Sequence, residues 1–475
     1  MAYIAGPDRT QAVLLPEVLD DYVGADNPVR FLDAFVAQLD LAAVGFQRAV
    51  PAETGRPGYD PGDLLRLYLY GYLHRIRSSR RLEQETHRNV ELMWLLRRLT
   101  PDFKTIADFR RDHPQALKGV GREFILLCRR LDLFGGELLA IDGSKFRAVN
   151  ARDRSYTPAR LATLQRDIDR TIARYLRELE RQDQVEAGTQ APSANALRAK
   201  IATLRQRRAR YETLQQELAA SGETARSLTD PDSRPMLSGG RIEVCYNVQT
   251  AVDAQHKLIV ADDVTNAAGD RDQLSPMARA AQAVLGGATP VVVADQGYYH
   301  GTEIKRCLDA GLIPLVPRPL TSANEARGLF TKDDFVYDPA ADGYRCPAGE
   351  FLTYRSTTVE LGRTIKNYRT RACRRCALRP RCTRNHDGRK LTRWVDEHLL
   401  EAMEQRLGRD RALFTQRKAL SEPPFGTMKR GMDQGYFLLK GLQKVRGEFS
   451  LTTLAYNLKR ALNIVGVPRL LEAVA

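Results

Sequence analysis

Two short apolar runs, residues 138–141 and 291–294, lie far apart in the chain, and each ends at or just before an aspartate that a glycine follows closely. Runs of this length and composition are typical of buried strands. Asp142 and Asp295 are therefore predicted to lie at the rim of a sheet, where glycine lets another backbone or a substrate approach closely. The pattern requires a fold whose sheet carries acidic side chains at its strand ends.

A third acidic residue, Glu422, lies in a basic segment that is predicted to be helical. Two strand-end aspartates and a helix-borne glutamate supply the oxygen ligands that two divalent cations, Mg²⁺ or Mn²⁺, require. Each residue also has a simpler interpretation. A strand-end Asp often forms a turn or caps a helix, and a Glu before proline is favoured at a helix start.

Net charge indicates the class of partner. The chain has 475 residues, of which 73 are Lys or Arg and 58 are Asp or Glu, so its formal charge is +15. Such an excess suits a polyanionic partner, such as double-stranded DNA, because each phosphate contact releases condensed counterions, but a basic soluble protein without such a partner would also show it. The first ten residues lack a signal-peptide pattern and no run of 18 apolar residues occurs, so we expect a cytoplasmic protein without a membrane partner.

The middle of the chain predicts an α/β fold. Apolar and polar residues alternate first with a period of two and then with helical spacing. The predicted elements are strands at 242–252 and 258–261, a helix at 272–286, the strand that ends at Asp295, a helix at 301–311 and a strand at 313–317. This order predicts a mixed sheet with helices on both faces.

Two regions are predicted to be entirely helical. Residues 1–135 form an N-terminal domain, in which the basic segment 75–81 between two helices suits a DNA-binding helix-turn-helix and a plain helical bundle equally well. Residues 151–225 form a helical hairpin with polar residues 182–194 as its turn. The hairpin either contacts DNA or a second subunit, or serves as a structural spacer.

Four of the seven cysteines cluster in a basic segment, residues 321–395. They are Cys346, Cys373, Cys376 and Cys382. Their spacing contains one CxxC pair, which in a cytoplasmic chain favours one structural Zn²⁺ over disulfides, with His386 as a substitute ligand. The alternative is a small loop-rich lobe of unmetallated cysteines. Its basic side chains suit either a clamp on DNA phosphates or a solvated surface.

Six blocks, in the same order, closely resemble bacterial insertion-sequence transposases of the DDE class, and the "eleven-eighty-two" group in particular. The blocks are IDGSKFRAVN (141–150), TDPDSRPM (229–236), GGRIEVCYNVQTAVD (239–253), DVTNAAGDRDQLSPM (263–277), ADQGYYHGTEI (294–304) and the segment 422–462, which begins EPPFGTMKRG. The N-terminal helical region also takes part, so the resemblance extends over nearly the whole chain.

The resemblance implies an RNase H-like core, made of residues 136–150, 226–320 and a helical C-terminal part, 396–475. The helical hairpin and the small Cys-rich insertion interrupt this core. A transposase of this class binds the terminal inverted repeats of an insertion sequence, cleaves the ends and joins the freed 3′-hydroxyls to target DNA. It works as a homodimer or larger assembly on DNA, here on the bacterial nucleoid.

The resemblance also assigns roles to single residues. Asp142, Asp295 and Glu422 become the catalytic carboxylates that hold two Mg²⁺ ions. Related transposases carry a Tyr-Arg-Glu-Lys signature whose lysine binds phosphate near the cleaved bond. Glu422 and Lys429 keep that spacing, but Lys418 and Thr415 replace the arginine and the tyrosine. The residues expected to bind DNA are Lys145, Arg417, Lys429 and Arg430.

Local geometry adds two expectations for Glu422. Residues seven apart on a regular helix share a face, so Glu422 and Lys429 are predicted to lie together, and Pro423 and Pro424 predict that the helix starts at Glu422. Two other functions stay open: an RNase H-like nuclease without strand transfer, and a DNA-binding protein that has lost catalysis. The helical N-terminal region together with the basic insertions argues against the first, and the three carboxylates argue against the second.

Overall fold

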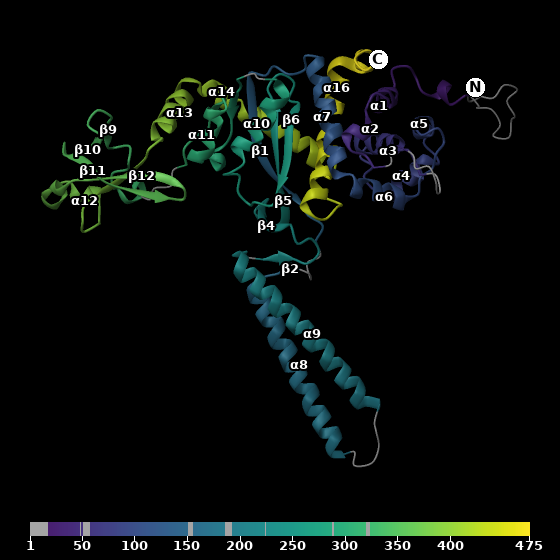
Figure 1. Ribbon diagram of the computed structural model, residues 1–475, viewed down its shortest axis with the longest axis horizontal. Coiled ribbons are helices and arrows are strands. Elements are labelled where there is room, and N and C mark those ends of the chain that lie inside the picture. Colours follow the sequence, from purple (N-terminus) through teal and green to yellow (C-terminus); the bar gives the residue numbers. More distant parts are fainter. Residues whose placement is uncertain are drawn as a thin grey trace, which may run out of the picture.

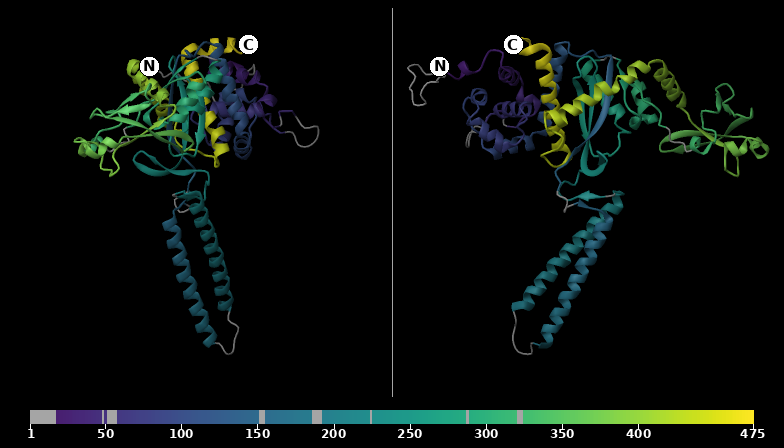
Figure 2. Two further views of the ribbon diagram at one scale, coloured as in Figure 1. Left: turned by 60° about the vertical axis from the view of Figure 1, so that its left-hand side comes forward. Right: turned by 180° about the vertical axis from the view of Figure 1, so that it is seen from behind.

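A mixed sheet lies at the centre of the molecule, between the N-terminal helices and a β-rich lobe (Figure 1). The hairpin of α8 (Pro158–Val185) and α9 (Pro192–Ser221) projects away from this sheet, as two further views show (Figure 2). The computed structural model describes residues 18–47, 49–50, 58–150, 155–185, 192–223, 225–286, 289–319 and 324–475.

The N-terminal region is helical, as the sequence predicts. A 3₁₀ turn precedes its helices, which are α1 (Pro28–Ala37), α2 (Leu41–Val44), α3 (Pro61–Leu73), α4 (Ser79–Thr86), α5 (Val90–Leu95), α6 (Phe103–Asp112) and α7 (Pro114–Arg130). Asn27 and Asp60 cap α1 and α3 by accepting backbone N–H bonds, and a proline follows each cap. Both faces of α3 are buried, so it forms the centre of this bundle.

The central sheet has six strands and is mixed, as the alternation predicts. They are β1 (Leu138–Arg147), β4 (Arg234–Ser238), β5 (Arg241–Asp253), β6 (Ile259–Thr265), β7 (Val291–Val293) and β8 (Ile313–Leu315). β5 runs antiparallel to β1, whereas β7 runs parallel to β1, and β8 parallel to β7. β4 and β6 both pair with the other edge of β5. β1 therefore lies between an antiparallel and a parallel partner.

Helices cover both faces of β1. Its odd-numbered apolar side chains pack against α10 (Leu274–Leu285) and α11 (Gly301–Asp309), and even-numbered ones pack against Leu420 of α15 (Arg417–Gly426). Successive side chains of a strand point to opposite faces. Asp142 therefore faces α15, and its two neighbours along the chain face the side of α10.

The C-terminal part continues through α13 (Glu397–Arg409), α14 (Arg411–Thr415), α15, a π-helical turn (Thr427–Gly431) and α16 (Leu442–Glu472). α16 contacts α7 and α3 of the N-terminal region and also β6. Its central turns are buried, so the N-terminal helices and one face of the sheet share a single hydrophobic core. None of the described helices is both long and apolar enough to cross a membrane.

A buried ion pair joins the N-terminal region to the C-terminal helix. The guanidinium of Arg77 donates to Glu448 Oε1 (2.8 Å) and to the Tyr436 carbonyl oxygen (2.6 Å), and both charged side chains are almost fully buried. Glu448 also accepts the backbone N–H groups of Leu438 and Leu439. The pair therefore fixes the segment between the π-helical turn and α16.

The β-rich lobe contains an antiparallel sheet of five strands in the order β13-β12-β11-β10-β9. They are β9 (Val336–Asp338), β10 (Gly343–Arg345), β11 (Phe351–Glu360), β12 (Arg363–Arg369) and β13 (Lys390–Trp394). The alternative of a loop-rich lobe is therefore wrong. Most side chains of β11 are exposed and polar, so its sequence lacks the apolar alternation that predicts a strand.

Asp262 on β6 gives a first prediction. Burial raises its pKa to about 6, while Lys118 and the hydroxyl of Thr453 (3.1 Å) favour the carboxylate. The folded protein thus binds this proton more tightly than the unfolded chain, and the resulting stability is lost as the pH rises through about 6. Asp262→Asn should raise the thermal unfolding midpoint at pH 8 and have a much smaller effect near pH 4. Equal shifts at both pH values would contradict the prediction.

Candidate active site

The structure brings Asp142 and Asp295 together at the point where the short strand β7 ends beside the longer β1. β1 and β7 are neighbouring parallel strands in which Ala140 pairs with Val293. Each aspartate follows two residues after one of these partners. The expectation that Asp142 follows the end of its strand is wrong, because β1 continues to Arg147 and stays paired with β5. Asp142 lies just past the stretch of β1 that pairs with β7, so it comes near Asp295, which follows the end of β7, although 153 positions separate the two residues (295 minus 142).

Asp142 is held between the strand and α15. Its Oδ2 accepts a hydrogen bond from Ser421 Oγ (2.7 Å) and lies 3.3 Å from Arg417 Nη1, while Oδ1 accepts the Gly143 N–H. Burial raises the pKa of Asp142, and the hydrogen bonds and Arg417 oppose this effect. The charge of Asp295 also raises the pKa, as expected of a nearby carboxylate.

Asp295 combines its place at the sheet edge with a local role. Its Oδ1 accepts the N–H of Gly297 at 2.8 Å and thereby caps the 3₁₀ turn Gln296–Tyr298. A side chain at position 297 would begin 2.9 Å from the same oxygen, so glycine is required for this close approach. The simpler interpretation of Asp295, as a turn former, is therefore correct. Its second carboxylate oxygen, Oδ2, does not take part in this hydrogen bond.

Glu422 is not placed beside the two aspartates. α15 begins at Arg417, so Glu422 lies inside the helix rather than at its start, and its side chain is exposed. Adjacent residues of an α-helix point about 100° apart. When Ser421 faces Asp142, Glu422 therefore points elsewhere. Within the described ranges, no three Asp, Glu, His or Cys side chains are arranged to hold a metal ion.

The basic residues near the site are mostly engaged inside the protein. Lys429 Nζ donates to Ser144 Oγ (2.7 Å) and to the carbonyl oxygen of Lys145 (2.8 Å), and burial lowers its pKa. Arg417 pairs with Asp142, whereas Arg430 is exposed. Lys429 lies in a π-helical turn, which has more residues per turn than an α-helix. A spacing of seven residues therefore does not place Lys429 on the same helix face as Glu422.

If the chain cleaves DNA, as its resemblance to transposases implies, Lys429→Met should slow cleavage about a hundredfold, because in-line attack at phosphorus depends on alignment to within about an ångström. DNA affinity should change little, since one of many cationic contacts alters the salt slope of binding by about one unit. Single-turnover cleavage and end binding, measured together, test this. Arg430→Met is the matched control, because it removes a neighbouring exposed charge. Equal cleavage by both variants would contradict the prediction.

Sequence reasoning missed a polar cluster on the other face of β1. Asp270 Oδ1 accepts hydrogen bonds from Asn247 Nδ2 and Gln249 Nε2, both at 2.7 Å, and lies 3.6 Å from Lys145 Nζ. The hydroxyl of Tyr298 donates to Gln249 Oε1. The one sequence signal for Asp270 was its place after a glycine in the block 263–277. The direction of its side chain depends on strands that are distant in the sequence.

The buried phenol of Tyr298 responds to the charges of three carboxylates. Burial raises its pKa well above the usual value, and the charges of Asp270, Asp142 and Asp295 raise it further, in that order. The phenol therefore stays protonated and serves as a hydrogen-bond donor. Asp270 therefore adds a third negative charge to those of Asp142 and Asp295 near this phenol.

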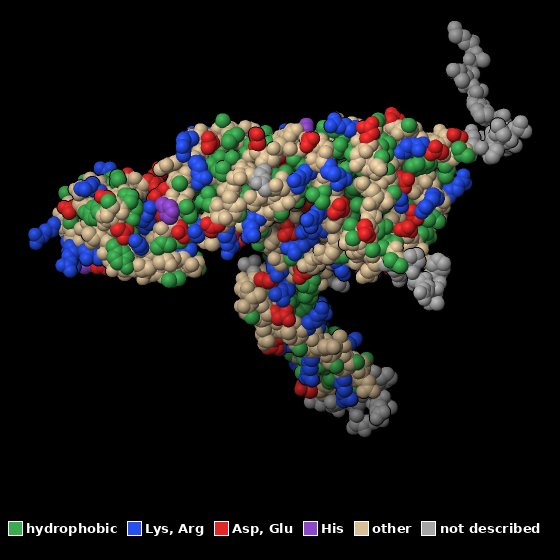
Figure 3. All heavy atoms as spheres, turned by 45° about the horizontal axis from the view of Figure 1, so that its top comes forward, with side chains coloured by type: hydrophobic (Ala, Val, Ile, Leu, Met, Phe, Trp, Pro, Cys, Tyr) green, Lys and Arg blue, Asp and Glu red, His purple; other side chains and the backbone are tan. Residues whose placement is uncertain are grey.

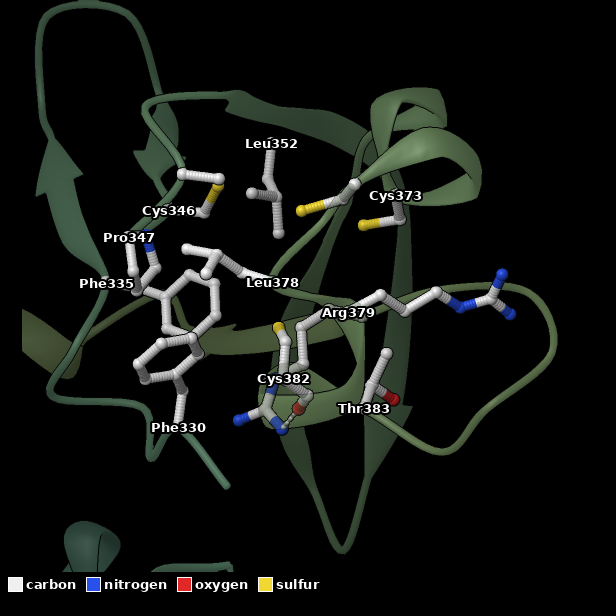
Figure 4. A pocket seen from close by; sticks show the side chains of 13 residues that line it. Phe330, Phe335, Cys346, Pro347, Leu352, Cys373, Leu378, Arg379, Cys382 and Thr383 are labelled. Carbon is white, nitrogen blue, oxygen red and sulfur yellow. Dashed lines mark hydrogen bonds between the residues drawn. The ribbon is translucent and has the colours of Figure 1, made fainter. Parts of the chain in front are cut away.

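The four clustered cysteines line one small cavity of about 20 Å³ in the β-rich lobe (Figure 4). The cavity wall also includes Phe330, Phe335 and Leu352, and all four thiols are free. These thiols do not form a metal-binding set among the described residues, so the zinc expectation is not supported. His386 is fully exposed and pairs with Asp387, which excludes it as a ligand in this arrangement.

Basic side chains are spread over the surface near the site. On the face drawn in Figure 3, Lys and Arg side chains lie over the central part of the molecule, and more line the hairpin. Arg170 and Arg181 of α8 are about three-quarters exposed. These charges suit a polyanion, although surface ion pairs neutralise several of them.

Comparison with known proteins identifies two matching families. A family model described as a transposase domain matches residues 17–112, and one described as a transposase DDE domain matches residues 345–462. The second range contains Glu422 and Lys429. No curated protein and no solved structure matched the chain. The two family matches, together with the sequence resemblance, support an insertion-sequence DDE transposase.

Proposed function

We propose that this transposase binds the terminal inverted repeats of an insertion sequence, cleaves the DNA at its ends and joins the freed 3′-hydroxyls to target DNA. The observation that carries the proposal is the pairing of Ala140 with Val293, since each of two aspartates follows two residues after one member of this pair. The match to a DDE domain and the RNase H-like strand order that it implies add support.

The donor set at the sheet edge fits divalent cations. Asp142 and Asp295 present hard carboxylate oxygens, which Mg²⁺ and Mn²⁺ prefer. Glu422 would join them after its side chain and the start of the following turn rotate, since Ser421 next to it already contacts Asp142. When bound, such ions activate a water or a 3′-hydroxyl and stabilise the leaving oxygen.

The chain's own basic groups perform the other tasks. Arg417 forms an ion pair with Asp142 in this structure. When cations bind Asp142 instead, the Arg417 side chain would be available to contact a phosphate oxygen. Lys429 and Lys145 lie on either side of β1 just beyond Asp142, where the scissile phosphate would be held. Arg430 would contact the DNA backbone further away.

Other parts would bind the DNA outside the scissile bond. The N-terminal helices would recognise the inverted repeat, and the hairpin and the β-rich lobe would contact its backbone. Cutting two ends in concert needs at least two copies of the protein, so we propose a homodimer or larger assembly on bacterial chromosomal or plasmid DNA. The domain boundaries remain predictions, namely 1–135, 136–150, 151–225, 226–320, 321–395 and 396–475.

One experiment tests this function. The purified protein is incubated with DNA of the element ends and a target plasmid in Mg²⁺, and the products are sequenced. Precise cuts at the ends and joined products are expected. Cleavage without joining would indicate the nuclease instead, and binding without cleavage would indicate a protein that has lost catalysis.

A further inference from the structure

We propose that Asp270 is a positioning residue for DNA cleavage, which holds the ammonium group of Lys145 at the active site. The inference rests on the proposed function and deepens it, because it assigns a role to a residue outside the three expected carboxylates. Asp270 and Lys145 come from segments 125 positions apart (270 minus 145) and meet beside Gly143, one residue after Asp142.

Asp270 is fixed by its surroundings. Two amide groups, from Asn247 and Gln249, donate to its Oδ1 at 2.7 Å, and Gln249 is itself held by the hydroxyl of Tyr298. Asn247 and Gln249 are fully buried neighbours on one face of β5, so their amide groups have little freedom. A carboxylate with both donors on one oxygen cannot rotate without losing two hydrogen bonds.

Lys145 is placed to use this fixed charge. It lies on β1 opposite Asn247, on the same face as Gly143, and its Nζ is 3.6 Å from Asp270 Oδ1. About 17% of its side chain is exposed, so the ammonium group borders solvent rather than the core. A rigid partner gives a flexible lysine side chain a defined position. Such a position is needed if the lysine is to align a bound phosphate for attack.

Lys145 is also linked to Lys429 across the strand. The carbonyl oxygen of Lys145 accepts the bond from Lys429 Nζ at 2.8 Å, and the charge of Lys145 contributes to lowering the pKa of Lys429. The two ammonium groups therefore lie on opposite sides of β1, and the charge of each disfavours that of the other. Without Asp270, repulsion between them would favour movement of Lys145 toward solvent.

Gly143 leaves room for this arrangement. A Cβ atom at position 143 would lie 2.5 Å from Gln249 Nε2 and 2.7 Å from Asp270 Oδ1, distances that no side chain tolerates. The other carboxylate oxygen, Oδ2, lies 3.9 Å from the corresponding point at Gly297. Asp270 thus packs against Gly143 and Gly297, which follow Asp142 and Asp295, and this couples its position to theirs.

The test compares Asp270→Asn with wild type in single-turnover cleavage of end DNA. Asparagine keeps the size of the side chain and an acceptor oxygen, but it removes the charge that holds Lys145. The maximal cleavage rate should fall about tenfold or more, while the DNA dissociation constant stays within about twofold. A purely structural role would change the unfolding midpoint and DNA affinity as well.

A double-mutant cycle identifies the route of the effect. If Asp270 acts through Lys145, then Asp270→Asn should slow cleavage no further in a Lys145→Gln background. Asp272→Asn is the matched control, because this carboxylate is 72% exposed and bonds His300. Additive losses, or an equal loss in the control, would overturn the proposal.

Lys145→Gln alone keeps the proposal testable if Asp270→Asn folds poorly, since it leaves the amide network intact. Normal cleavage by Lys145→Gln would overturn the inference. Failure of the proposed function looks different, because then the wild-type protein itself would cleave no end DNA. Wild-type cleavage with unaffected variants would reject only the role of Asp270.

Discussion

Replacing Asp142 by asparagine should abolish DNA cleavage and joining while the folded protein becomes more stable at pH 8. The rate should fall by at least about a thousandfold, because a cation-binding carboxylate supplies several kcal/mol of transition-state stabilisation. Burial raises the pKa of Asp142, so its charged form costs stability at neutral and alkaline pH. The gain should disappear as the pH falls below the usual range for aspartate.

Asp295→Asn and Glu422→Gln should abolish cleavage as well, and end binding should persist in all three variants. Asp309→Asn is the control, since it removes an exposed carboxylate from α11. Cleavage is measured on end DNA and stability by calorimetry at pH 8 and pH 4. Near-normal cleavage by Glu422→Gln would remove that residue from the catalytic set, which matters because its side chain is exposed in this structure.

Replacing Arg77 by methionine should destabilise the protein by about 3–5 kcal/mol, because it leaves the buried carboxylate of Glu448 without its partner. The same change should slow cleavage, since Arg77 also holds the Tyr436 carbonyl in the segment that follows Lys429. Thermal unfolding and single-turnover cleavage are the measurements.

Arg77→Met combined with Glu448→Gln should recover part of the lost stability. Glutamine removes the uncompensated charge, and its oxygen still accepts the N–H groups of Leu438 and Leu439. A loss below about 1 kcal/mol for Arg77→Met would show that the ion pair does not join the two regions energetically, because exposed pairs contribute only that much.

Elements with a strong local pattern could be predicted from the sequence. The apolar runs before Asp142 and Asp295 became β1 and β7, and helical spacing placed α10 and α11 within about two residues of their observed ends. The strands of the β-rich lobe escaped prediction. β11 pairs mainly through backbone hydrogen bonds and exposes polar side chains, so its sequence gives no period-two signal.

The site is harder to predict because its contacts are long-range. Ser421 and Asp142 are 279 residues apart, and no local pattern states which side chain of α15 turns toward the strand. Glu422 was expected there, but its neighbour Ser421 makes the contact. Asp270 depends on two amide groups from β5. A sequence can therefore identify acidic candidates, whereas tertiary packing decides which of them meet.

The hairpin sets a length scale for any DNA that contacts it. α8 has 28 residues and α9 has 30. At 1.5 Å per residue these helices are roughly 42–45 Å long, which corresponds to about a dozen base pairs of duplex. The hairpin leaves the central sheet through β2 (Ser155–Tyr156) and β3 (Arg226–Ser227), which form one short antiparallel pair. A duplex that touched both the sheet edge and the far ends of these helices would therefore be gripped at points more than one helical turn apart.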